Sequence, residues 1–474
     1  MASWVEDKDW HRFRLDDLRL LLDVGSGSLH MIDEITWDIL DYYDPCDRGE
    51  GETEREAVIE ALQGRYPVEQ IRDALAELNQ LRADGLIAAG DPLGNAYRPA
   101  GDAIVKALCL IITEACNLRC RYCFAGRGEQ SQASMSEAVA KRSIDFLLEN
   151  SGNRRHCEVD FFGGEPLLNF KTVKAAVEYG RRQASKCGKE LKFTLTTNCV
   201  LLNDEVADFL REHGISVVLS LDGRREINDN MRFFPGGRGT YDIILPRIKG
   251  LLASINGLDY WVRGTYTREN LDFASDVMHL VDIGFQRISV EPVVAAETAE
   301  TEAFSLRGED LPAIEAEYDR LARLYLELKR QGRGFSFFHF NVDLDGGPCI
   351  YKRLIGCGAG NEYLAVSPAG ELYPCHQFVG RGKYLIGDVF SGIRDQNIRR
   401  TFKNAHIYNK PECSSCWARF YCGGGCHANA DQFHGDIFHP YEVGCALMKK
   451  RLECALLVQA ASTLDQIGAM SEQQ

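Results

Sequence analysis

Three cysteines stand close together in the run EACNLRCRYCF, at Cys116, Cys120 and Cys123. Their spacing is C-x3-C-x2-C, with the aromatic residue Tyr122 directly before the last thiol. Three thiolates can hold three corners of a four-iron cube and leave one iron free to bind a small molecule, whereas four thiolates close the cube. The triplet therefore predicts catalysis at an open iron. Taken alone, the same spacing also fits a zinc or structural thiol site.

The chain has seventeen cysteines in all. Because its first residues are acidic and polar rather than a secretory signal, clustered cysteines indicate metal or redox chemistry more than disulfides. The triplet and a second group of eight suit one open cluster and two closed ones, although the C-x2-C pair in the second group also fits zinc. The second group is Cys349, Cys357, Cys375, Cys413, Cys416, Cys422, Cys426 and Cys445. Most of the remaining six are expected to pack as small apolar residues: Cys46, Cys109, Cys157, Cys187, Cys199 and Cys454.

Composition describes an acidic globular protein. Its 474 residues are too many for one ordinary core, so two to four domains are expected. Lys and Arg total 54 and Asp and Glu total 69, which gives a net charge of −15. This charge, without any basic run, argues against nucleic-acid binding, and no apolar stretch reaches the length of a membrane span. We expect a cytoplasmic protein that binds neither nucleic acid nor membrane.

Strand and helix patterns alternate from residue 105 to residue 310, which predicts an α/β domain. Six β-α repeats favour a parallel sheet, either open or curled into a partial (β/α)6 barrel. Polar motifs fall at the C-terminal ends of the strands, where the βα loops of parallel barrels converge. The expected strands are Ala107–Ile112, Glu158–Phe162, Lys192–Thr196, Ser216–Leu221, Tyr260–Thr265 and Arg287–Glu291.

Further segments flank this domain. Residues 1–90 are expected to form a small α+β unit, followed by a linker at 91–104 that is rich in glycine and proline. A bridging segment at 311–334 contains one long amphipathic helix, Leu311–Arg330. Residues 335–454 form a part rich in cysteine and glycine whose fold metal ligation would set, and 455–474 are a tail. The N-terminal unit has expected strands at His11–Leu15, Leu20–Val24 and Leu29–Ile32 and helices near Glu34–Tyr43, Thr53–Gln63 and Val68–Asp84.

The residues at the strand ends have the chemistry to hold S-adenosylmethionine. Paired glycines allow close approach of a ligand, Glu165 can accept hydrogen bonds from an ammonium, and Arg232 can fork onto a carboxylate. Hydroxyl and amide side chains suit a ribose. Each motif also has a plainer explanation: GGEP and SLDG are ordinary turn sequences, and Arg263 with Glu291 fits an ion pair inside a barrel. The full candidate set is Gly163, Gly164, Glu165, Thr197, Asn198, Ser220, Asp222, Arg232, Arg263 and Glu291.

The triplet, the GGEP run and the SLDG run resemble the radical S-adenosylmethionine (SAM) superfamily. The resemblance implies a 4Fe–4S cluster held by Cys116, Cys120 and Cys123, which cleaves bound S-adenosylmethionine to a 5′-deoxyadenosyl radical. The C-terminal cysteines resemble SPASM domains, which carry two auxiliary 4Fe–4S clusters. By that resemblance one auxiliary cluster takes Cys413, Cys416, Cys422 and Cys445, and the other takes Cys357, Cys375 and Cys426, with Cys349 as the candidate fourth ligand.

The N-terminal unit resembles a RiPP recognition element, a winged-helix-like module that binds leader peptides by strand addition. The strand is expected to add at Leu29–Ile32, against the helix near Val68–Asp84; a packing or dimerisation domain is the alternative. Over nearly the whole chain, runs such as SGNRRHCEVDFFGGEPLLNF and FTLTTNCVLLND resemble the maturases of six-cysteine (SCIFF) peptides. One departure is Cys199, where the family run TTNG has glycine.

These resemblances imply a radical SAM enzyme that installs thioether crosslinks between cysteine sulfur and carbon in a cysteine-rich precursor peptide. It would bind the peptide through its leader and receive electrons from a donor such as a ferredoxin or flavodoxin. The alternatives are a sulfatase-maturase-like enzyme that makes formylglycine, a peptide epimerase, and a non-catalytic cluster scaffold that binds a cysteine-rich partner. His339, His376 and His427 are expected to be structural rather than ligands.

Overall fold

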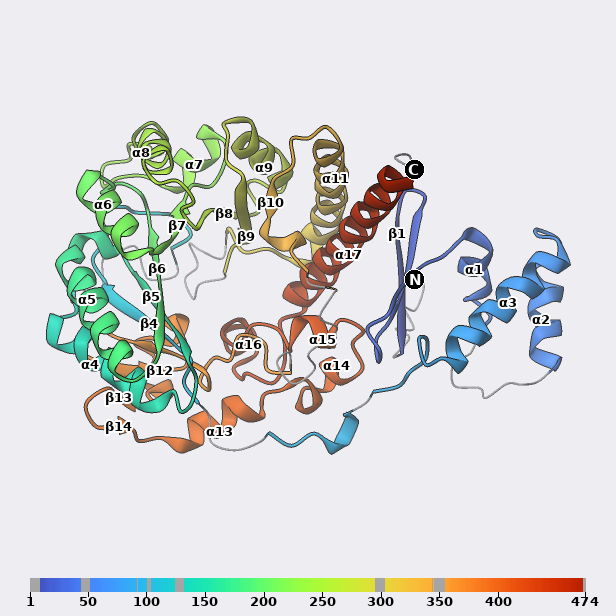
Figure 1. Ribbon diagram of the computed structural model, residues 1–474, viewed down its shortest axis with the longest axis horizontal. Coiled ribbons are helices and arrows are strands. Elements are labelled where there is room, and N and C mark those ends of the chain that lie inside the picture. Colours follow the sequence, from blue (N-terminus) through green and yellow to red (C-terminus); the bar gives the residue numbers. More distant parts are fainter. Residues whose placement is uncertain are drawn as a thin grey trace.

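The computed structural model describes residues 9–43, 52–91, 93–99, 104–123, 132–294, 303–342, 344 and 354–471. Its centre is a curved parallel sheet whose strands β4 to β9 lie side by side in chain order, with helices on the outer face (Figure 1). All six strands expected from the sequence are present, and their ends agree to within two residues. They are β4 Ala107–Thr113, β5 His156–Gly163, β6 Glu190–Thr197, β7 Ser216–Ser220, β8 Tyr260–Tyr266 and β9 Arg287–Pro292.

Side chains on each barrel strand alternate between the helical layer and the interior. In β6, Leu191, Phe193 and Leu195 are buried against the outer helices, while Lys192 and Thr194 face the inner side. The sheet does not close, because β4 and β9 pair with other strands, so the fold is a partial barrel. Helices of the outer layer are α4 Glu137–Asn150, α5 Phe170–Lys186, α6 Asp204–His213, α7 Arg225–Met231, α8 Tyr241–Ser254 and α9 Phe273–Asp282.

The cysteine-rich C-terminal part continues the same sheet. Strand β11 (Tyr363–Val366) pairs in parallel with β4, and three short strands extend the sheet beyond it. At the other edge, β10 (Ser336–Phe337) pairs with β9. The expected boundary at residue 335 therefore lies elsewhere, because β10 belongs to the barrel. The remaining elements here are β12 Glu371–Tyr373, β13 Gly387–Asp388, β14 Gly392–Ile393, α13 Gln396–Asn404, α14 Pro411–Ser414, α15 Arg419–Cys422 and α16 His427–His434.

The C-terminal residues are not a separate tail. Helix α17 (Glu442–Ser471) runs through the expected boundary at residue 454 and packs along the bridging helix α11 (Leu311–Arg330), as Figure 1 shows. Cys454, Leu456 and Leu457 are fully buried in this contact. The first half of α17 is therefore part of the main body. Among the described residues, no helix combines the length and apolar character that crossing a membrane would require.

The N-terminal unit has the expected strands and helices, with a three-stranded antiparallel sheet in the order β1-β2-β3. One face of the sheet, with Phe13 and Leu20, joins the core of the main body, while Leu21 faces a second small core formed with the three helices. His11 ties the sheet to the C-terminal part, because its ring stacks on Trp417 at 3.9 Å and its Nε2 lies 2.8 Å from Glu453. The elements are β1 Trp10–Leu15, β2 Leu18–Asp23, β3 Leu29–Met31, α1 Glu34–Ile39, α2 Glu52–Leu62 and α3 Val68–Ala83.

Candidate functional site

The cysteine triplet lies in the loop that follows β4. Backbone amides of the loop donate to the end of α7 and the segment after it: Arg121 N bonds to the carbonyl of Met231 at 2.9 Å and Arg119 N to that of Phe233 at 2.8 Å. The three thiols lie close enough together to interact electrostatically. Burial raises the pKa of the Cys120 thiol to about 12. A bound metal is the kind of charge that can hold such buried thiols as thiolates.

Gly163 and Gly164 lie directly against the backbone that leads into the cysteine loop. A Cβ on Gly163 would lie 2.2 Å from the carbonyl oxygen of Thr113, and one on Gly164 would lie 2.2 Å from that of Ala115. Two backbone hydrogen bonds join the segments at this close approach: Gly164 N donates to Thr113 O at 2.8 Å, and Glu165 N donates to Ala115 O at 2.9 Å. In the structure the two glycines let the backbone leading into Cys116 approach the end of β5.

Glu165 is fully buried and links two strand ends. Its carboxylate accepts hydrogen bonds from the Leu167 amide, the Thr197 hydroxyl (2.8 Å) and the Asn198 amide (2.7 Å). Burial raises the pKa of Glu165 to about 6 against the effect of these donors. Asn198 in turn donates from Nδ2 to Asn117 Oδ1 at 2.7 Å, inside the cysteine loop. Because a carboxylate offers about four acceptor positions, Glu165 retains room for one further donor.

A second buried network surrounds Tyr122. Its hydroxyl donates to Asp222 at 2.7 Å and accepts from Arg232 Nη1 at 2.8 Å, and the Arg232 and Asp222 side chains are 3.9 Å apart. Burial raises the pKa of Asp222 to about 6, although Arg232 and Tyr122 act in the opposite direction. Arg232 and Asp222 are therefore joined through a residue of the cysteine loop. Tyr122 was not among the candidate site residues; its place inside the cysteine spacing was the available signal.

The remaining candidates lie on the inner wall of the barrel. Ser220 and Glu291 are half-buried, and Arg263 is exposed toward the interior with no hydrogen-bond or ion-pair partner among the residues that the structure describes. Glu291 pairs with His339 Nε2 at 3.0 Å rather than with Arg263. Burial acts to raise the pKa of Glu291, but the charge and hydrogen bond of His339 outweigh it and hold this pKa well below its usual range. The Tyr318 hydroxyl lies 2.9 Å from His339 Nδ1, so Glu291, His339 and Tyr318 form a row of interacting polar side chains.

Cys199 occupies a backbone conformation that favours glycine. Its φ is 67°, and its side chain is fully buried with the thiol 3.5 Å from the Thr197 carbonyl. The family's glycine at this position therefore has a conformational reason, and the cysteine adopts the same left-handed geometry at an energetic cost. Burial raises the pKa of this thiol well above its usual range. Cys199 is therefore a buried neutral side chain behind Asn198.

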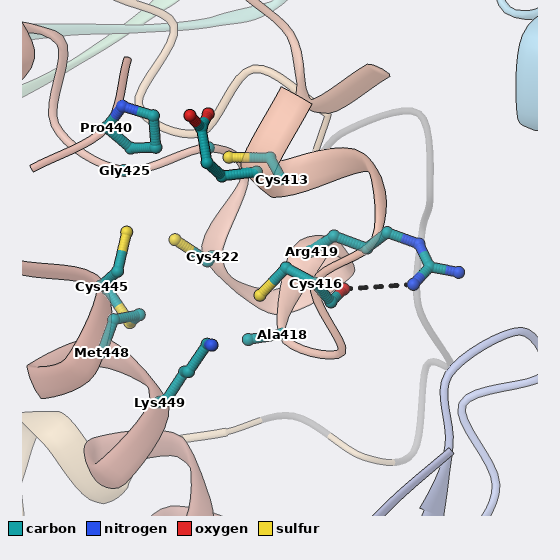
Figure 2. A pocket seen from close by; sticks show the side chains of 12 residues that line it. Cys413, Cys416, Ala418, Arg419, Cys422, Gly425, Pro440, Cys445, Met448 and Lys449 are labelled. Atoms are coloured by element: carbon teal, nitrogen blue, oxygen red, sulfur yellow. Dashed lines mark hydrogen bonds between the residues drawn. The ribbon is translucent and has the colours of Figure 1, made fainter. Parts of the chain in front are cut away.

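Four thiols of the C-terminal group line one cavity. Figure 2 shows Cys413, Cys416, Cys422 and Cys445 with their sulfur atoms turned toward the same hollow. The cavity has a volume of about 130 Å³, where a single water requires only ~10–15 Å³. The space therefore suits a group larger than one ion. No three His, Cys, Asp or Glu side chains within the described ranges form a site for a single metal ion.

Three further thiols form a separate group. Cys357, Cys375 and Cys426 lie close enough together to interact electrostatically. Burial raises the pKa of Cys375 to about 12. The structure thus brings seven of the eight C-terminal cysteines together in the two sets expected from the sequence. Cys349, the candidate fourth ligand of the second set, lies outside the described residues.

Comparison with known proteins identifies the barrel. Residues 110–270 match the Radical SAM superfamily. An uncharacterized protein of Methanocaldococcus jannaschii is 34% identical over 190 residues, which are 40% of this chain and 62% of that protein. The chain thus spans less than two thirds of that relative. A serine-type anaerobic sulfatase-maturating enzyme of Klebsiella aerogenes is 26% identical over 336 residues, 67% of this chain and 79% of that enzyme.

The fold is also similar to a solved structure that includes the N-terminal unit. Streptococcus suis SuiB, bound to S-adenosylmethionine, superposes with a TM-score of 0.53 at 17% identity and covers 92% of this chain and 98% of its own. The α/β fold expected from the sequence is confirmed by this likeness and by the parallel sheet. Residues 110–270 are thus similar to the Radical SAM superfamily, and the fold of the chain is similar to that of SuiB.

Proposed function

We propose that this chain is a radical SAM enzyme that installs thioether crosslinks in a cysteine-rich precursor peptide. The observation that carries the proposal is the arrangement of three thiol sets in one molecule: an open triplet at the barrel mouth and two further sets beside it. An open iron suits chemistry, and closed clusters suit the acceptance of an electron. Forming a C–S bond from C–H and S–H leaves one electron to be removed after the hydrogen atom and the thiol proton have gone.

The triplet would hold the first 4Fe–4S cluster, and when bound with S-adenosylmethionine it would supply a radical that removes a hydrogen atom. The chain's own residues fit this group. The cysteine triplet supplies three ligands, Glu165 has a spare acceptor position for an ammonium, and Arg263 is free to meet an acidic group. Ser220 lies at a strand end beside that of Thr197 and offers a hydroxyl, whereas the Thr197 hydroxyl donates to Glu165.

Leader binding is proposed at the free edge of β3. Hydrogen bonds from Asp23 N to Ser28 O and from Ile32 N to Arg19 O fix the register with β2, so the backbone polar groups of Leu29 and Met31 point away from it. Within the described part of the chain no strand pairs with this edge. An added peptide strand would satisfy these groups. SuiB has been solved with its precursor peptide SuiA, which supports such a partner for a chain of this fold.

The test is anaerobic reconstitution with iron and sulfide, followed by S-adenosylmethionine, a reductant and a short cysteine-rich precursor peptide that carries a leader. We expect about twelve iron atoms per chain, four for each cube, release of 5′-deoxyadenosine, and a peptide lighter by two hydrogen atoms per crosslink. Formylglycine formation, the first alternative, would instead alter the cysteine itself, and epimerisation would leave the mass unchanged. A protein that carries zinc, or iron without cleavage of S-adenosylmethionine, contradicts the proposal.

The leader site has its own test. Met31→Pro removes an outward amide hydrogen without breaking the hydrogen bonds to β2, so leader affinity should fall at least tenfold in a fluorescence binding titration with that peptide. Met31→Ala keeps the amide and serves as the matched control. Equal affinity of both variants would exclude strand addition at this edge.

A further inference from the structure

Lys410 is buried between the two C-terminal thiol sets. It is fully buried, and no other lysine in the described ranges is. Its Nζ donates to the carbonyl of Gly424 at 2.7 Å, and no carboxylate among the described residues lies within ion-pair distance of it. An ammonium has three donors and a full charge, so one neutral carbonyl satisfies only part of its requirement. A buried cation without an opposite charge is costly, which indicates that an anionic group belongs beside it.

The groups that face this ammonium are cysteines from both sets. Cys413, Cys422 and Cys445 come from the cavity of Figure 2, and Cys426 comes from the other set; the charge of Lys410 acts on all four. Free thiols are neutral and do not compensate a cation. Four thiolates on a 4Fe–4S cube give a group with net negative charge, and two such groups would flank Lys410.

We propose that Lys410 is a shared countercharge that raises the reduction potentials of both auxiliary clusters. The inference rests on the proposed function. Reduction adds one negative charge to a cluster, and a fixed positive charge in a water-poor interior stabilises the reduced form. In the crosslinking step the acceptor carbon gives a hydrogen atom to the 5′-deoxyadenosyl radical and the substrate thiol gives its proton to a base. The electron left after the C–S bond forms then passes to an auxiliary cluster, where Lys410 favours its acceptance.

The test uses the full chain with Cys116, Cys120 and Cys123 replaced by alanine, so that auxiliary clusters alone give a signal. Lys410→Met keeps the length of the side chain and removes its charge. In a redox titration followed by electron paramagnetic resonance, both potentials should fall, each by a tenfold or greater loss in the equilibrium constant for reduction, which is about 59 mV for one electron. Lys449→Met is the matched control, because Lys449 lines the first cavity and acts on Cys445; it should lower one potential only.

Unchanged potentials in Lys410→Met with full iron content would overturn the inference. If Lys410→Met fails to assemble clusters, recovery of iron in Lys410→Arg supports a countercharge. Loss of iron in both variants would show that the shape of the lysine side chain is what matters, and would overturn the inference. Wild-type protein without iron would refute the proposed function itself, so the two failures are distinguishable.

Discussion

Replacing Gly164 by alanine should displace the cysteine loop. The added Cβ would lie 2.2 Å from the carbonyl oxygen of Ala115 and 2.7 Å from that of Glu114, where carbon–oxygen contacts below 3.0 Å essentially do not occur. The two segments must therefore separate by about 0.8 Å, the difference between 3.0 and 2.2 Å. Ala115 directly precedes Cys116, so the shift reaches the first thiol of the triplet.

The magnitude follows from what this separation breaks. Overpacking costs about 1–3 kcal/mol, and weakening the hydrogen bonds from Gly164 N and Glu165 N costs about 1 kcal/mol each. A total loss of ~3–5 kcal/mol in stability is expected. Because a misplacement near 1 Å can lower a rate about 100-fold, cleavage of S-adenosylmethionine should fall by a similar factor.

The assay measures iron per chain, the rate of 5′-deoxyadenosine release with a chemical reductant, and the melting temperature. Gly250→Ala is the matched control, because Gly250 lies on the exposed face of α8 with no atom near its Cβ position. It should leave the rate unchanged and add about 0.5–1 kcal/mol of stability. Wild-type iron content and rate in Gly164→Ala would refute the reasoning that this glycine positions the loop.

Three further predictions concern other parts of the molecule. Burial raises the pKa of Asp160 from 3.8 to about 6, so the protonated carboxyl favours the folded state and this stability is lost as pH rises through about 6. Asp160→Asn should therefore be more stable than wild type at pH 8, by ~1–3 kcal/mol, and by less at pH 5. A pH-independent difference in stability would contradict this. Trp417→Ala removes the ring on which His11 stacks and should cost ~3–5 kcal/mol, seen as faster proteolysis of the N-terminal unit; an unchanged cleavage rate would argue against this contact. Tyr122→Phe removes the hydroxyl that joins Arg232 to Asp222 and should cost ~1–3 kcal/mol in stability and weaken S-adenosylmethionine binding in calorimetry. Wild-type stability and affinity in this variant would contradict the prediction.

Much of the barrel followed from local pattern. Strands such as β6 alternate apolar and polar residues with a period of two, and parallel strands must carry their functional groups at one edge, so both the strand positions and the clustering of their ends were predictable. The grouping of the C-terminal thiols was predicted by a family resemblance and not by spacing alone. The continuation of the sheet through β11 was not predictable, because a four-residue strand of this kind carries no signal about its distant partner.

By itself the sequence determined which residue types are available and how closely they are spaced along the chain: the thiol triplet, the strand-end polar groups and the second cysteine group. The tertiary structure decided what each of them touches. It placed Gly163 and Gly164 against the backbone of the cysteine loop, paired Glu291 with His339, and buried Lys410 between two thiol sets. Spacing along a chain reports only neighbours in sequence, whereas charge pairing and close packing depend on which distant segments share one interior.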